Sequence, residues 1–209
     1  MKKLLLLILG VTGCESKALV KESAIITPEM GEASALTEDD RLQDFVLKLM
    51  KITTTKASPM KQQIIAQSLV RVSKKIFASY EQRTNFAVLV AIESGFNPAI
   101  KSAAGAIGLA QIMPKYARDF GKLCGVSNFD SKEDIYDVEI NLTLGACLYR
   151  ELLGNFDGNN ALALVAYNSG AKSRAISELS ELRNITNIET ANYVTKFSYV
   201  KHLVSNEKN

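Results

Sequence analysis

The sequence NFAVLVAIESGFNP, residues 85–98, gives the strongest indication of how this chain folds. Seven consecutive residues, Phe86 to Ile92, are uncharged and mostly large and apolar, which is typical of a helix buried on nearly all sides. Gly95 is a natural end for such a helix, because glycine readily takes the left-handed conformation that closes one. We therefore predict a buried helix that runs from about Thr84 to Ser94.

Helical patterns continue on both sides of this stretch. Thr37 and Asp40 resemble a capping box that opens a first helix, and Ser58-Pro59 restarts the chain with proline in a first helical turn. Because no segment shows sustained strand alternation, the predicted fold class is all-α, or mainly α. Further helices are expected over about 109–113, up to Phe120, over 140–153 with a stop at Gly154, over 160–168 and over 188–203, with one more cap at Ser131 and Asp134.

Glu93 occupies an unfavourable place for a carboxylate, in the last turn of the predicted buried helix. The C-terminal end of a helix carries partial negative charge, and apolar neighbours withhold water from the ionised form. Both effects raise the pKa of Glu93, as a general acid near neutral pH requires. The alternative is a helix-end glutamate that points to solvent.

The N-terminus has the pattern of an export signal. Lys2 and Lys3 precede a short apolar run, Leu4 to Leu9, which is too short to span a bilayer as a helix. The residues before Cys14, Val-Thr-Gly, resemble the lipobox of bacterial lipoproteins, in which the cysteine is lipidated after cleavage. We expect a signal peptide over 1–13 and a lipid on Cys14. A plain secretory signal with an incidental cysteine is the alternative.

Composition and patterning divide the rest of the chain. Residues 14–36 are mixed and polar and predict a tether, residues 37–80 predict N-terminal helices, and residues 81–209 predict the main domain. The formal charge is only +3, so nothing favours a nucleic-acid partner. Cys124 and Cys147 form one disulfide or remain two small buried residues, and the sequence leaves both open.

Four ordered motifs carry a resemblance to a known family. They are Glu93-Ser-Gly-Phe-Asn-Pro98, the segment from Ser102 through Gly105, Gly108 and Gln111-Ile-Met113-Pro114, then Ala166-Tyr167-Asn168-Ser-Gly170, and Glu189-Thr-Ala-Asn-Tyr193-Val. Over about residues 80–200 this set resembles the catalytic domain of the soluble-type lytic transglycosylases, part of the goose-type lysozyme-like superfamily. The resemblance implies a lysozyme-like domain behind an N-terminal helical extension.

The resemblance also implies roles at the matched positions. Glu93 matches the single catalytic acid, and Tyr167 matches a tyrosine whose hydroxyl lies close to it and can hydrogen-bond it. The remaining matches are to residues that line or close the sugar cleft, where Gly105 and Gly108 would let the backbone approach the substrate. Those cleft residues are Ser102, Gln111, Met113, Asn168, Glu189 and Tyr193. For Met113, Glu189 and Tyr193 a purely structural role in the core or at a helix end stays open.

Two positions depart from the family pattern. The family often has methionine where this chain has Ala110, and it favours tyrosine where this chain has Cys147. These departures put the detail of the sugar subsites in doubt and leave the acid unaffected.

The implied activity is cleavage of the β-1,4 bond between N-acetylmuramic acid and N-acetylglucosamine in peptidoglycan, with a 1,6-anhydro product. No cofactor or metal is expected, and the expected site is the periplasmic face of a bacterial membrane, in particular the outer membrane. The alternatives are a hydrolytic muramidase of the same fold and a non-catalytic glycan-binding lipoprotein. A dedicated secretion or cell-wall machine is a further candidate partner.

Overall fold

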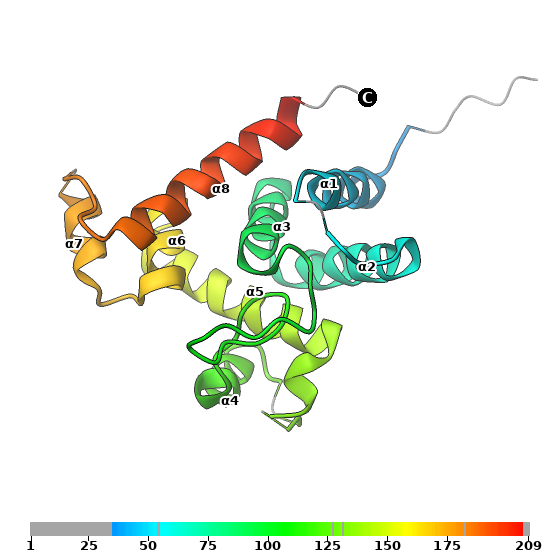
Figure 1. Ribbon diagram of the computed structural model, residues 1–209, viewed down its shortest axis with the longest axis horizontal. Coiled ribbons are helices and arrows are strands. Elements are labelled where there is room, and N and C mark those ends of the chain that lie inside the picture. Colours follow the sequence, from blue (N-terminus) through cyan, green and yellow to red (C-terminus); the bar gives the residue numbers. More distant parts are fainter. Residues whose placement is uncertain (1–34, 54, 127, 131, 182, 207–209) are drawn as a thin grey trace, which may run out of the picture. The chain divides into compact units, whose positions relative to one another are not determined.

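Figure 1 shows the computed structural model, which describes residues 35–206 except 54, 127, 131 and 182. Over these residues the chain forms eight α-helices and one short 3-10 helix, without a β-strand, so the mainly α prediction is confirmed. None of the described helices is both long and apolar enough to cross a membrane. The predicted signal peptide, Cys14, the tether up to residue 34 and the predicted cap at Ser131 lie outside the described residues.

The first three helices begin at side-chain or proline signals. The capping box of Thr37 and Asp40 opens α1 (Glu38–Ile52), with the Asp40 N–H 3.1 Å from the Thr37 hydroxyl oxygen, as predicted. Pro59 stands in the first turn of α2 (Pro59–Ile76), also as predicted. α3 (Tyr80–Ser94) begins four residues before the predicted start, because Ser79 and Gln82 form a capping box there.

α3 lies at the centre of the core. Every residue from Thr84 to Ile92 is buried, and α3 packs against α1, α2 and α8 (Ile188–Asn206). α5 (Val138–Asn155) in turn packs against α2 and α6 (Asn160–Ser169). A single hydrophobic cluster contains residues from all of these helices, so the N-terminal helices share the core of the main domain.

The predicted short helix over 109–113 is wrong. The chain instead doubles back there, and Ile107 pairs in antiparallel fashion with both Lys101 and Ile112. Gly108 and Gln111 have φ values of 79° and 49°, a left-handed conformation that a right-handed helix cannot include. A helix, α4 (Pro114–Lys122), begins only after this turn.

Several helix ends differ from the prediction, and α7 (Arg174–Ser180) was not predicted. α5 begins at Val138, because the Asp137 carboxylate caps the N–H groups of the first turn. It also passes through Gly154, the predicted stop. The left-handed residues that turn the chain are Asp157 and Gly158, whose N–H donates to the Leu153 carbonyl at 2.7 Å. α6 ends near the predicted Gly170, and α8 begins at the predicted residue 188 and extends past 203.

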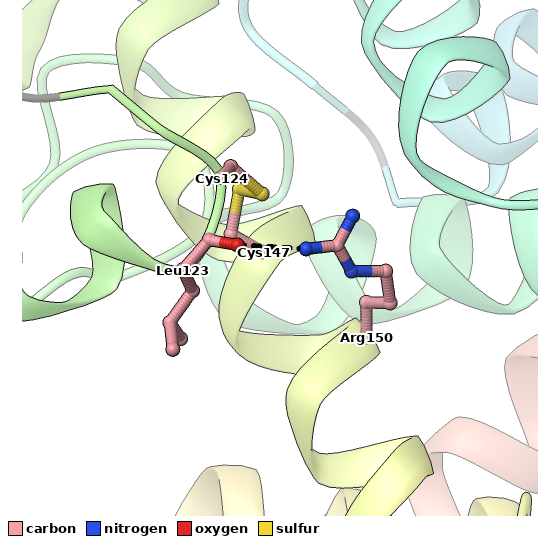
Figure 2. Close-up of a disulfide and its surroundings, with 4 residues drawn as sticks. All are labelled: Leu123, Cys124, Cys147 and Arg150. Carbon is pink, nitrogen blue, oxygen red and sulfur yellow. Dashed lines mark hydrogen bonds between the residues drawn. A yellow bond between two sulfur atoms is a disulfide. The ribbon is translucent and has the colours of Figure 1, made fainter.

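Cys124 and Cys147 form a disulfide, which the sequence left open (Figure 2). Their Cα atoms are 5.9 Å apart, and Cys147 is fully buried on α5. Beside the bridge, the Arg150 guanidinium donates to the Leu123 carbonyl at 2.8 Å. These contacts fasten the segment after α4 to α5. A second, smaller hydrophobic cluster is formed by Ile107, Ala110, Ile112, Ala117, Phe129, Ile135 and Leu144.

Candidate active site

Glu93 lies half-buried in the last turn of α3, and Gly95 ends the helix with a φ of 57°. Burial raises the pKa of Glu93 from 4.5 to about 7, while the Tyr193 hydrogen bond and the charge of Lys196 lower it in part. The rise expected from the apolar sequence before Glu93 is therefore present. A carboxyl group with such a pKa is divided between its acid and base forms near neutral pH.

α8 contributes two of the groups that act on Glu93. The Tyr193 hydroxyl donates a 2.6 Å hydrogen bond to Oε1 of Glu93. One turn later on α8, Nζ of Lys196 donates to the Ile92 carbonyl at 3.3 Å. Burial and the charge of Glu93 raise the pKa of Tyr193 well above 10, so this hydroxyl remains a donor. α8 therefore orients the acid and places a positive charge at the negative end of α3.

Tyr167 makes a different hydrogen bond from the expected one. Its hydroxyl donates to the Ala110 carbonyl at 2.7 Å, and the bond to Glu93 comes from Tyr193. Burial, and then the charge of Glu93, raise the pKa of the Tyr167 hydroxyl well above 10, so this group too is influenced by the acid. Gly145 on α5 leaves room for this arrangement, since a Cβ there would collide with Ala110 and lie 3.2 Å from the Tyr167 hydroxyl oxygen.

Four of the predicted substrate residues line one cleft of about 460 Å³: Gln111, Met113, Tyr167 and Asn168. The cleft also contains residues that were not predicted, Tyr116 and Phe120 from α4 and Leu148 and Leu152 from α5. Nε2 of Gln111 donates to the Gly108 carbonyl at 2.9 Å, so its carbonyl oxygen is the group left for a ligand. The cleft thus offers amide and aromatic groups, as sugar binding requires.

Three further predicted contacts are not among the residues that line this cleft: Ser102, Glu189 and Tyr193, whose hydroxyl bonds Glu93. The Ser102 hydroxyl accepts the Ala106 N–H at 3.0 Å and so shapes its own loop. Glu189 is exposed in the first turn of α8, where a negative charge suits the helix dipole. Its neighbour Thr190 reaches inward instead and donates to Oδ1 of Asn168 at 3.1 Å.

Asn141 is a structural residue that the sequence reasoning missed. It is buried on α5, and its amide donates to the Ile107 and Ile135 carbonyls at 2.9 Å and accepts the Ala110 N–H at 2.8 Å. The space beside Gly108 is filled by this side chain. Gly108 was expected to let the backbone approach the substrate, but the group that lies close to it is Asn141. An amide side chain between Ile140 and Leu142, in a largely apolar run of α5, was the available signal.

Comparison with known proteins gives consistent matches. Residues 72–186 match the family model described as the transglycosylase SLT domain. The chain is 35% identical over 78 residues to the soluble lytic murein transglycosylase of Escherichia coli K12. This aligned segment covers 37% of this chain and 12% of that protein. It is 30% identical over 130 residues to the membrane-bound lytic murein transglycosylase D of the same strain, covering 58% of this chain and 28% of that protein.

The fold also matches a solved structure. The crystal structure of the 70 kDa soluble lytic transglycosylase from Escherichia coli superposes with a TM-score of 0.58 at 19% sequence identity. The match covers 81% of this chain and 31% of the other. The chain therefore shares the helical fold of that protein and corresponds to a minor part of the length of each relative.

Proposed function

Because this chain belongs to the transglycosylase SLT domain family, we propose that it is a peptidoglycan lytic transglycosylase with Glu93 as its catalytic acid. The observation that carries the proposal is the pKa of Glu93, which burial raises to about 7 at the end of a buried helix. Among the described residues, no second carboxylate contributes to that shift. A one-carboxylate mechanism fits this arrangement.

In the proposed reaction Glu93 first acts as an acid. It protonates the glycosidic oxygen between N-acetylmuramic acid and N-acetylglucosamine, and the C1–O bond breaks. The N-acetyl oxygen of the muramic residue stabilises the positive charge that develops at C1. The Glu93 carboxylate then removes the proton from the 6-hydroxyl of the same sugar, whose oxygen bonds to C1. The ring closes to the 1,6-anhydro product without water, and holding the nucleophile within the substrate lowers the entropic barrier.

The cleft lined by Gln111, Met113, Tyr167 and Asn168 is the proposed path of the glycan strand. Tyr193 holds the acid through its hydrogen bond to Oε1. Ser102 and Glu189 remain predicted substrate contacts on the strength of the motif positions alone. We propose no cofactor and no metal for the reaction, and no nucleic-acid partner.

Purified sacculi test the reaction assignment. We expect the wild type and the control Glu151→Gln, an exposed position on α5, to release 1,6-anhydromuropeptides detectable by mass spectrometry. Glu93→Gln should fold and bind strands but release them at a rate about 10²–10⁴-fold lower. Products heavier by one water would identify a hydrolytic muramidase. Glycan binding without products from the wild type would identify a binding lipoprotein.

We also propose that the chain is exported, lipidated on Cys14 and held at the periplasmic face of a membrane, in particular the outer membrane. The lipobox-like Val11-Thr-Gly-Cys14 supports this, as does the similarity to a membrane-bound transglycosylase. Labelled palmitate should mark the wild type and spare Cys14→Ala, and equal labelling would overturn the proposal. Service to a dedicated secretion or cell-wall machine remains a prediction that co-purification from membranes would test.

A further inference from the structure

A second cleft lies at the end of α3, between the N-terminal helices and the segment after the acid. Its volume is about 720 Å³, within the range of small-ligand sites. One wall is the α1–α2 connection, including Thr55, Lys56 and Ser58, with Lys61 from the first turns of α2. The other wall is the segment Ser94–Ala99, which begins directly after Glu93. The lining of this cleft therefore begins at the residue after the acid, and none of its described lining residues also lines the proposed glycan cleft.

The charge of this second cleft has one sign. Among the described residues that line it, Lys56 and Lys61 are the only charged ones, and none carries a carboxylate. Both lysines are exposed, and within the described part of the chain neither forms an ion pair with a carboxylate. Two ammonium groups without partners, from two different elements, suit a ligand that carries carboxylates.

Hydrogen bonds hold both walls of the cleft in place. The Thr55 N–H donates to the Met50 carbonyl at 3.1 Å, and the Gln62 amide donates to the Ala57 carbonyl at 2.8 Å, so the backbone is fixed on either side of Lys56. Across the cleft, the Asn97 side-chain oxygen accepts the Ala99 N–H at 3.1 Å. Its amide NH₂ remains as a donor toward a ligand. A cleft fixed in this way has less conformational entropy to lose on binding.

We propose that this cleft binds the carboxylates of the peptide stem attached to the muramic residue of the strand being cut. The proposal rests on the function proposed above. A ligand here touches Ser94 and Gly95, the two residues after the acid, and the peptide stem is the anionic branch of the sugar on which that acid acts. The α1–α2 connection and the start of α2 then act in substrate selection, because they supply Lys56 and Lys61.

The test compares the full-length chain with a Lys56→Gln/Lys61→Gln double variant on three substrates. These are glycan strands with intact stems, the same strands with amidated stem carboxylates, and strands stripped of stems by an amidase. We expect the double variant to raise KM about three- to tenfold on intact stems with little change in kcat. Wild type and double variant should not differ on amidated or stripped strands. A control, Lys75→Gln/Lys132→Gln, removes two exposed lysines that line neither cleft and should match the wild type.

Each outcome decides for or against the proposal. A KM difference that is confined to intact stems and fades at about 0.5 M salt supports charge recognition. Equal behaviour of wild type and double variant on all three substrates overturns it, as does an equal loss on all three, which would make the lysines structural or glycan-binding. If the wild type forms no anhydro product from any substrate, the proposed function itself has failed.

Discussion

Glu93 is subject to opposing influences that together suit a residue required to give a proton and then take one. Burial raises the pKa of its carboxyl group, whereas the Tyr193 hydrogen bond and the charge of Lys196 lower it. Burial alone would hold the proton too tightly for the base step. The two groups from α8 stabilise the ionised carboxylate, and the resulting pKa of Glu93 is about 7.

Replacing Tyr193 by phenylalanine should move the pH profile. The Tyr193 hydroxyl lowers the pKa of Glu93, so its loss raises that pKa, and the decline in rate near pH 7 should shift to higher pH. The maximal rate should fall about tenfold or more, since a hydrogen bond to a charged group contributes about 1.5–3 kcal/mol. Initial rates of anhydro-product release from pH 5 to about 9 measure both effects. Tyr199→Phe, at an exposed position on the same helix, is the control. An unchanged profile in Tyr193→Phe would show that the hydroxyl is idle.

The raised pKa of Glu93 also predicts a pH-dependent cost in stability. Its folded value, about 7, lies above the ordinary 4.5, so the contribution of this group is fully present below pH 4.5 and is lost as pH rises through 7. Relative to Glu93→Gln, the wild type should lose up to about 3 kcal/mol of unfolding free energy across this window. Urea denaturation of both proteins at several pH values measures the difference. Parallel stability curves would mean that the carboxyl group is better hydrated than its burial indicates.

At the scale of the elements, the sequence predicts helix interiors better than helix ends. The apolar run before Glu93 identifies α3, because a fully buried helix needs no polar face. Its start was missed because the Ser79–Gln82 capping box precedes that run by several residues. The stop predicted at Gly154 failed because glycine ends a helix only where the backbone turns left-handed, and that turn comes at Asp157 and Gly158.

Gly95 and Gly154 form a matched pair that tests this distinction. Gly95 has a φ of 57°, and an added Cβ would meet no atom within 4 Å, so Gly95→Ala should cost about 1–2 kcal/mol from backbone strain alone. Gly154 lies within α5 in open space, so Gly154→Ala should stabilise the protein by about 0.5–1 kcal/mol. Thermal unfolding of both variants gives the two signs. A shift in the same direction for both would refute the assigned conformations.

At the scale of the whole molecule, the sequence predicts which residues gather but not which atoms bond. The order of the motifs predicted that Gln111, Met113, Tyr167 and Asn168 lie together, and in the structure they line one cleft. The hydroxyl that donates to Glu93 belongs to Tyr193, 100 residues further along the chain. The Tyr167 hydroxyl donates instead to the carbonyl of Ala110, 57 residues before it. Such pairings depend on how α8 and the 105–112 turn pack, and periodicity carries no information about that geometry.

The disulfide joins the segment after α4 to α5, and its loss should also affect the neighbouring wall of the glycan cleft. It closes a loop of 23 residues between the end of α4 and the middle of α5, which includes Phe129 and Ile135 of the smaller core. Loop closure of this size contributes about 3 kcal/mol to stability. Leu148, which follows Cys147, lines the glycan cleft, so a loosened loop should also weaken strand binding.

Reduction tests this contribution, with a cysteine-free variant as the control. We expect dithiothreitol to lower the urea midpoint of the wild type to that of Cys124→Ala/Cys147→Ala, and to leave that variant unchanged. Because the larger core contains α1, α2 and α3, none of which carries a cysteine of the bridge, the helical signal should persist in the reduced protein below its new midpoint. Amide exchange should rise first in residues 105–135 around the smaller core. The contrary result is a urea midpoint of the wild type that stays unchanged after reduction has been shown to free both thiols. That result would mean that the packing of α4 on α5 holds this region without the bridge.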